Sequence, residues 1–477
     1  MSTITIHQTG LKLGAFLGAL IFMSIWTYFY GPAIWYLAGI AVGVYALSYR
    51  LEWGWYVLVA LAPFIHLQLF FNRFAVVAND FPWLASMNAP LADVWAVVLI
   101  SALGIFFLRQ FFSGQKISLR APFLFFFSLF VASAVLSLGG QLFSVQSLGV
   151  KYLAHFLLLF YLGYFIVGAN IVSSVNIWRQ SLGILAGVGF LGALMGFVSL
   201  PLGLWAVGGF RRAVPFALGG IFPFGDQHIF LAEVITVAVP IFAYFYSEAK
   251  TLMQKKFYAV TGIFVLLIGL LTLSRAAWVT LAVMGVVWVA LFWRKFSLAG
   301  IARKYWWLVG ILLALVGYFT YFISVSSAVA GSNTTRWMLT DIAWRMFLRR
   351  PWTGIGVGSF VPSVGESYAF FLDFGGPQDA HGILQKIGTE QGMIGVLAFV
   401  GFIGAIIWAL WQAYRRAQSD VVVRRAYLLS IFLVMAVLVF QIFNTQYYSG
   451  KFWAPLALAV ISLYIFKSGS NQNRLSS

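Results

Sequence analysis

Long apolar runs recur from one end of the chain to the other, and they constrain its fold more than any other feature. Of 477 residues, 62% are hydrophobic and 9% are charged, whereas a soluble domain carries about a quarter charged residues. A soluble fold of this length could not cover so much apolar surface. The runs are continuous rather than alternating, which favours spanning helices over the strands of a β-barrel. The expected fold class is an all-α polytopic membrane protein.

The runs predict about fourteen transmembrane helices, or twelve to thirteen if a short pair is re-entrant. The expected spans are 12–30, 33–49, 53–71, 91–109, 122–139, 151–170, 181–201, 228–247, 257–273, 276–293, 305–325, 391–413, 426–444 and 450–466. A long loop, 326–390, interrupts this series, and its aromatic residues indicate amphipathic helices at the membrane surface. Three regions follow from this pattern: 1–200, a central region 201–405 that contains the loop, and 406–477.

The net charge of +18 has a topological explanation. If the N-terminus is cytoplasmic, most of the 30 basic residues fall in cytoplasmic loops, as the positive-inside rule requires, and the C-terminus is cytoplasmic too. Basic residues also meet anionic lipid, so the charge does not indicate nucleic acid. The chain has no cysteine, which excludes a disulfide framework and thiol chemistry.

The same topology places a group of basic residues on the opposite, outer side, where the positive-inside rule does not explain them. The group is Arg73, Lys151, Arg211, Arg212, Arg275, Arg336, Arg345, Arg349, Arg350, Lys386 and Lys451. Guanidinium groups bind phosphate oxygens in pairs, so such a cluster suits a phosphate or pyrophosphate. Alternatively, each side chain extends along the bilayer and pairs with lipid phosphate.

Arg275 is the most specific member of this group. It stands in "LTLSRAAWVTLAVMG", between two apolar runs with almost nothing separating them. A charge so close to the hydrocarbon is costly and indicates function. Ser274 can cap the following helix, which is a structural reason for the same pattern, and the positive end of that helix would face the same anion.

The long loop begins with "GSNTTRWMLTDIAWRMFLRRPWTGIGVGSF". Asn333 or the threonine after it can cap a helix that Pro351 ends. At 100° per residue, Arg336 and Arg350 lie about 40° apart on one face of this helix, whereas Arg345 and Arg349 lie nearly opposite. The glycines that follow predict a tight turn rather than a nucleotide-binding loop.

His381 stands before the next span and is a candidate general base. A lone histidine is more often structural, so its position alone does not decide. His228 and Glu233, with Asp226 before them, could line the same cavity as His381, but the sequence indicates this only weakly. The sequence has no HExxH motif and no set of metal ligands with the usual spacing, so we expect no metal and no cofactor.

The segments "SRAAW", "TTRW…RRPWTGIGVGSF" and "AHGILQKIGTEQGMIGVLAF" together resemble the O-antigen ligase and polymerase superfamily, over about residues 205–405. This resemblance implies a bacterial inner-membrane glycosyltransferase whose long loop and active site are periplasmic. The implied donor is a glycan on undecaprenyl pyrophosphate. The resemblance also implies an acceptor, which is another glycan, lipid A core or a protein, and a reaction without a metal ion.

The resemblance also implies roles for individual residues. Arg275 and Arg336 match the two arginines that hold the pyrophosphate, and His381 matches the base that activates the acceptor hydroxyl. Glu390 matches a supporting acid, and Arg211, Arg212 and Arg350 are further supporting candidates. The chain departs from the family pattern in one place, because Gly382 stands where asparagine commonly follows the histidine.

Three functions therefore remain open. Fourteen spans favour a polymerase of O-antigen or exopolysaccharide repeat units, which would work beside a chain-length regulator. A ligase that transfers the finished glycan is the alternative. A polysaccharide transporter or flippase is a third reading, but transporters usually carry ionisable groups at mid-membrane, and such charges are nearly absent from these spans.

Overall fold

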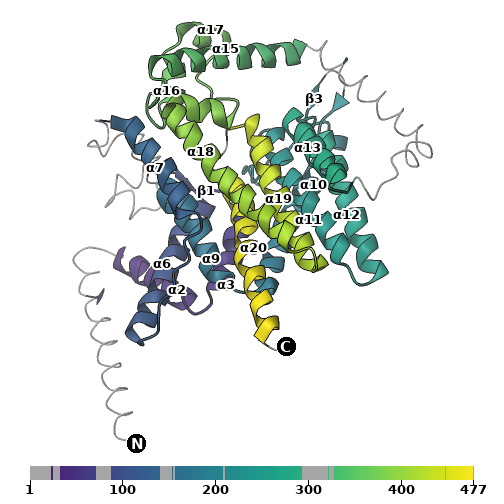
Figure 1. The fold of residues 1–477 in the computed structure, drawn as a ribbon. Helices are drawn as coiled ribbons and strands as arrows, with labels where there is room; N and C mark the ends of the chain where they lie inside the picture. Colours follow the sequence, from purple (N-terminus) through teal and green to yellow (C-terminus); the bar gives the residue numbers. More distant parts are fainter. Residues whose placement is uncertain are drawn as a thin grey trace, which may run out of the picture.

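The computed structural model describes residues 23–24, 33–70, 88–139, 153, 156–207, 210–292, 321, 327–445 and 447–475. In these ranges the chain is predominantly helical (Figure 1). The helices are α2 (Ala33–Leu47), α3 (Leu51–Leu61), α6 (Leu91–Phe112), α7 (Leu124–Leu138), η3 (Phe156–Ile166), α9 (Val167–Ile171), α10 (Val175–Leu202), α11 (His228–Glu248), α12 (Leu252–Leu271), α13 (Arg275–Phe292), α15 (Ser327–Arg349), α16 (Phe360–Gly365), α17 (Tyr368–Phe374), α18 (Ile383–Arg416), α19 (Val421–Ile442) and α20 (Gly450–Leu475). Two antiparallel ribbons pair β1 (Gln68–Phe70) with β2 (Asn88–Pro90) and β3 (Ala206–Val207) with β4 (Phe210–Arg211).

Among the described residues, six helices are long and apolar enough to cross a bilayer: α6, α10, α11, α12, α18 and α19. Shorter apolar helices occur in α2, α3, α7, η3 with α9, α13 and α20. The chain is therefore a multi-pass helical membrane protein, as its composition predicts. The expected spans 12–30 and 305–325 lie outside the described residues, apart from 23–24 and 321. A total of fourteen spans remains a prediction.

One expected span, 53–71, is wrong. Helix α3 has 11 residues and ends at Leu61, which gives a length of about 16 Å, roughly half of a bilayer core. Pro63 follows two residues later, and proline disfavours a continuing helix. Residues 62–67 form turns, and strand β1 follows, in which Gln68 pairs with Pro90 of β2.

Several helices begin at polar caps that the sequence places in short loops. Ser174 accepts a hydrogen bond from the backbone N–H of Ile177 at the start of α10 (3.3 Å). Thr251 and Gln254 form a reciprocal capping box at the start of α12. Such caps satisfy backbone donors that the first helical turn leaves unpaired.

Helix α20 lies at the centre of the bundle (Figure 1, yellow). Its residues 451–461 are almost completely buried. The Trp178 indole donates to the carbonyl of Leu458 at 2.9 Å, and Trp453 stacks on Phe160 with ring centroids 5.4 Å apart. An apolar helix packed on all sides in this way anchors the helices around it.

Helices α15, α16 and α17 gather at one end of the bundle, with α15 lying across it (Figure 1). They share a small core of their own, around Leu339, Phe360 and Phe370. Residues 327–382 of the expected loop 326–390 thus contain helices, as predicted. The helix that follows, α18, begins at Ile383, eight residues before the expected span 391–413. Asn333 does not cap α15, because that helix begins six residues earlier, at Ser327.

Helix α18 is interrupted at Gly392, whose φ of 67° and ψ of −165° are not helical. The turn before α16 fills this interruption. The N–H groups of Ile355 and Gly356 donate to the carbonyls of residues 389 and 390, and the N–H groups of residues 393 and 394 donate to the carbonyls of Pro351 and Trp352. Four backbone groups that the break leaves unpaired are therefore satisfied, which is the condition for irregular backbone inside a membrane protein.

The fit between turn and break requires two glycines. A Cβ atom at Gly354 would lie 2.3 Å from the Glu390 carbonyl, and a Cβ atom at Gly392 would lie 2.4 Å from that of Trp352. Both glycines also have positive φ, a conformation that other residues rarely adopt. The predicted tight turn in "GIGVGSF" is present, and it fixes the end of α15 against the start of α18.

Candidate functional site

Arg275 is the first residue of α13, as the sequence predicts. The chain turns sharply between α12 and α13, and the Ser274 hydroxyl accepts from the N–H of Ala277 (3.4 Å) at the start of the new helix. The Arg275 guanidinium donates to the Asn333 Oδ1 atom of α15 at 2.8 Å. Arg275 is thus tied to the helix that carries Arg336.

Arg336 lies one turn after Asn333 on α15 and is half-buried. Its Nε atom is buried without a hydrogen-bond partner among the described residues. Burial lowers the pKa of Arg336, and the positive charge of Arg275 lowers it further. Two arginines that repel each other, one with an unused donor, form a site that an anion would stabilise.

His381 lies in the loop immediately before α18, next to these arginines. Burial lowers its pKa to about 4, and the charges of Arg336 and Arg275 act in the same direction, while Asp379 opposes them. The imidazole is therefore neutral at pH 7 and can accept a proton. An anion bound between the arginines would offset their charge and make the imidazole more basic.

Hydrogen bonds hold the loop of His381 from several helices. Asp379 pairs with Lys386 at 2.7 Å and accepts from the Tyr448 hydroxyl at 3.1 Å. The Thr445 hydroxyl donates to the carbonyl of Ala380 at 2.7 Å. The N–H of His381 itself donates to the Gln385 side chain at 3.2 Å. The histidine thus sits on a backbone fixed to α18 and to the segment between α19 and α20.

Arg212 and His228 extend the positive site on the side of α11. The Arg212 guanidinium lies 3.2 Å from the His228 Nδ1 atom, and His228 also interacts electrostatically with Arg336. Burial lowers the pKa of Arg212, whose Nε atom has no hydrogen-bond partner among the described residues. His228 gave only a weak sequence signal, since nothing in its local pattern shows that it meets Arg212.

Other predicted supporting residues lie elsewhere. Arg211 donates to the carbonyls of Leu200 and Pro201, at 3.1 and 3.0 Å, and so satisfies the end of α10. Arg350 is exposed just past the end of α15. Glu390 is fully buried and accepts from the N–H of Phe360 at 3.2 Å, which places it behind the glycine turn.

A buried ionic cluster joins α11, α19 and α20. Lys451 and Glu233 form an ion pair with 2.8 Å between Nζ and Oε2, and both side chains are at most 2% exposed. The Gln441 side chain donates to the other Glu233 oxygen at 2.6 Å. Because a buried charge needs a partner, this pair accounts for Lys451 without any ligand.

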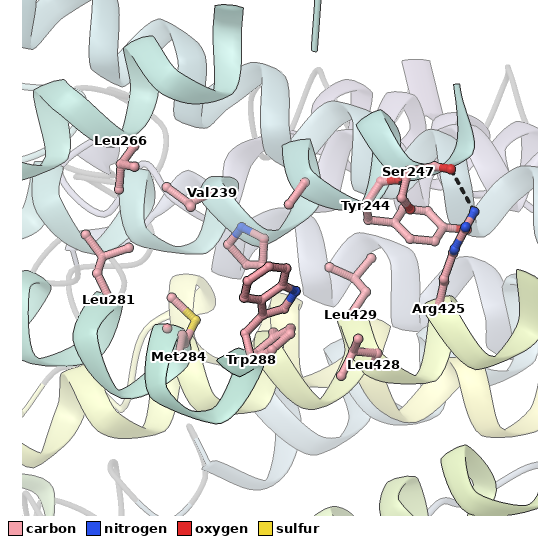
Figure 2. A pocket seen from close by; sticks show the side chains of 14 residues that line it. Val239, Tyr244, Ser247, Leu266, Leu281, Met284, Trp288, Arg425, Leu428 and Leu429 are labelled. Atoms are coloured by element: carbon pink, nitrogen blue, oxygen red, sulfur yellow. Dashed lines mark hydrogen bonds between the residues drawn. The ribbon is translucent and has the colours of Figure 1, made fainter. Parts of the chain in front are cut away.

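The structure also contains an apolar cavity of about 460 Å³ among α11, α12, α13 and α19 (Figure 2). Val239, Leu281, Met284 and Trp288 line it, and Arg425 closes one end by donating to the carbonyl of Ser247 at 2.7 Å. None of the predicted site residues lines this cavity. In the described residues, no group of three or more His, Asp or Glu side chains is placed to hold a metal ion.

The fold and this cluster define a class: a multi-pass membrane protein with a basic site, two arginines beside a neutral histidine, where a helical loop meets the bundle. Residues 260–400 match the family model described as O-antigen ligase. The predicted resemblance to the O-antigen ligase and polymerase superfamily is thereby confirmed over the segment that contains Arg275, Arg336 and His381. No curated protein matches the sequence. The family match supports a membrane glycosyltransferase of the ligase or polymerase type that uses a lipid-linked glycan and an acceptor.

Proposed function

We propose that the protein transfers a glycan from undecaprenyl pyrophosphate to an acceptor hydroxyl at the periplasmic face of the bacterial inner membrane. The observation that carries the proposal is the meeting of Arg275, Arg336 and His381 from three separate parts of the chain. A pyrophosphate supplies the negative charge that the arginines lack, and the histidine has the protonation state of a general base.

The proposed reaction is a single displacement. The acceptor oxygen forms a bond to the anomeric carbon while the bond from that carbon to the pyrophosphate oxygen breaks, and this inverts the anomeric centre. His381 takes the hydroxyl proton, and the electron pair leaves with undecaprenyl pyrophosphate. Arg275 and Arg336 stabilise the charge that develops on this leaving group, so the reaction needs no metal ion.

Arg212 is placed to assist the same step. Its guanidinium, in the segment before α11, lies 3.2 Å from the His228 Nδ1 atom, and His228 in turn interacts electrostatically with Arg336. Among the described residues Arg212 forms no ion pair with a carboxylate. A guanidinium without an acidic partner keeps its full charge for a ligand, because no carboxylate neutralises it. Arg211 and Glu390 have structural roles in this proposal, and Arg350 is not assigned to the chemistry.

We favour polymerisation of O-antigen or exopolysaccharide repeat units. The description of the matching family favours the second candidate, a ligase that transfers the glycan to lipid A core or to a protein. The two reactions differ in their acceptor, which the residues of the site do not identify. A chain-length regulator would be a partner only in the first case.

The experiment uses protein reconstituted in liposomes with lipid-linked repeat units from the source bacterium. Release of undecaprenyl pyrophosphate with donor alone, together with a ladder of longer lipid-linked glycans, supports a polymerase. Release that requires added lipid A core or acceptor protein supports a ligase. If neither acceptor condition releases undecaprenyl pyrophosphate, the glycosyltransferase proposal is wrong.

A further inference from the structure

A second cavity, of about 650 Å³, lies between α15 and the segment of α16 and α17. It opens on the side of α15 that faces away from the catalytic residues. At 100° per residue, Asp341, Arg345 and Arg349 stand roughly 140°, 180° and 220° from Arg336 around the helix. This groove is therefore separate from the arginine and histidine site.

The groove has an apolar floor and a polar rim. Met338, Ile342 and Met346 line its floor, and the side chain of Trp337, which is 75% exposed, stands at its edge. A mainly apolar surface with a few convergent polar groups is typical of a small-molecule site. A large exposed tryptophan beside such a floor offers a flat surface for a ligand to stack on.

The rim carries two acidic and two basic side chains. Asp341 and Arg345 form an exposed ion pair at 2.7 Å. Arg349 and Glu366 complete the rim and form no ion pair in the part of the chain that the structure describes. Two acids and two bases cancel in charge, so the groove does not select an anion such as a phosphate. Carboxylates and guanidinium groups side by side supply several acceptors and donors.

We propose that this groove binds a segment of the carbohydrate chain. A sugar ring presents a C–H face that packs against an aromatic ring and hydroxyls that both donate and accept hydrogen bonds. Trp337 and the floor match the first property, and the rim matches the second. The choice of a glycan rests on the proposed function, which brings a glycan to the opposite face of the same helix.

The position of the groove explains what it would do. A helix with its side chains is about 10 Å across, so a glycan bonded at the catalytic face can pass over α15 and reach the groove while one end stays at the reacting centre. Binding there retains the chain between transfers and holds it away from the bilayer.

The test measures binding without turnover. Oligosaccharides cut from the surface polysaccharide of the source bacterium are titrated into the detergent-solubilised full-length protein by calorimetry. We expect wild-type protein to bind, and Trp337→Ala and Glu366→Gln to bind about tenfold more weakly, which corresponds to roughly 1.4 kcal/mol. Trp352→Ala is the matched control, because that tryptophan is 68% exposed and lies outside the groove.

The alternatives are distinguishable. Absence of binding to wild-type protein, or equal binding by the two groove variants and the control, overturns the groove proposal. An Arg275→Ala variant should bind the oligosaccharides as wild type does, because the substitution removes only a side chain that binds pyrophosphate and these oligosaccharides carry none. If that variant still released undecaprenyl pyrophosphate at the full rate, the catalytic proposal would fail. The titration would still show whether the groove binds the oligosaccharides.

Discussion

Replacing Gly392 by alanine should destabilise the protein by a large and calculable amount. The new Cβ would lie 2.4 Å from the backbone of Trp352, which cannot rotate away as a side chain can. The φ and ψ of Gly392 belong to a region that is essentially restricted to glycine and costs other residues about 1–3 kcal/mol. Overpacking of the neighbouring backbone adds about 1–3 kcal/mol. The sum is roughly 2–6 kcal/mol, before any loss of the four hydrogen bonds across the break.

Gly401→Ala is the matched control for this substitution. Gly401 lies in the same helix, and a Cβ atom there would meet nothing within 4 Å. Alanine is favoured over glycine in a helix interior by about 1 kcal/mol, so this variant should be as stable as wild type or more so. Thermal unfolding in detergent, followed by tryptophan fluorescence, compares the two. We expect Gly392→Ala to melt several degrees lower. Equal melting temperatures would refute the role assigned to the break in α18.

Three further substitutions test the site and its support. In Arg336→Gln the pKa of His381 should rise, because a positive charge that lowers it is gone. The acid limb of the pH profile of kcat/KM should therefore move to higher pH. An unmoved limb would show that Arg336 does not act on the pKa of His381. Glu233→Gln leaves Lys451 buried without its anion and should destabilise the protein by about 3–5 kcal/mol, whereas Glu233→Leu combined with Lys451→Met should recover most of that loss in a melting assay. Arg211→Ala should retain turnover of lipid-linked donor, since its guanidinium binds the end of α10; a hundredfold loss would place it in the chemistry.

The transmembrane architecture was predictable wherever hydrophobicity alone decides it. Helix α11 begins at His228 and α20 at Gly450, at the starts of the expected spans. The exception is α3, where an apolar run continues past Pro63 as a strand, because hydropathy does not distinguish helix from strand in short segments. The break at Gly392 also escaped prediction, since the apolar pattern runs through it and only its backbone conformation reveals it.

The sequence nominates residues for the candidate site, but it does not show which partners they meet. Arg275 was identified from its place at a helix start, which is local information. The hydrogen bond from Arg275 to Asn333 joins residues far apart in the chain, and the asparagine had a simpler local explanation as a helix cap. Arg211 and Arg212 looked equivalent in sequence, yet one binds a helix end and the other meets His228. Adjacent side chains diverge in this way because successive residues of an extended chain direct their side chains to opposite sides.

The central claim is that His381 removes the acceptor proton while the arginines hold the leaving pyrophosphate. It is tested most directly by the rate of undecaprenyl pyrophosphate release from lipid-linked glycan in liposomes, measured for wild type and His381→Ala at matched protein amounts. General base catalysis typically contributes about 10²–10⁴-fold. We expect His381→Ala to lose at least about a hundredfold in rate while donor binding is retained. Release by His381→Ala within a few-fold of the wild-type rate would contradict the account.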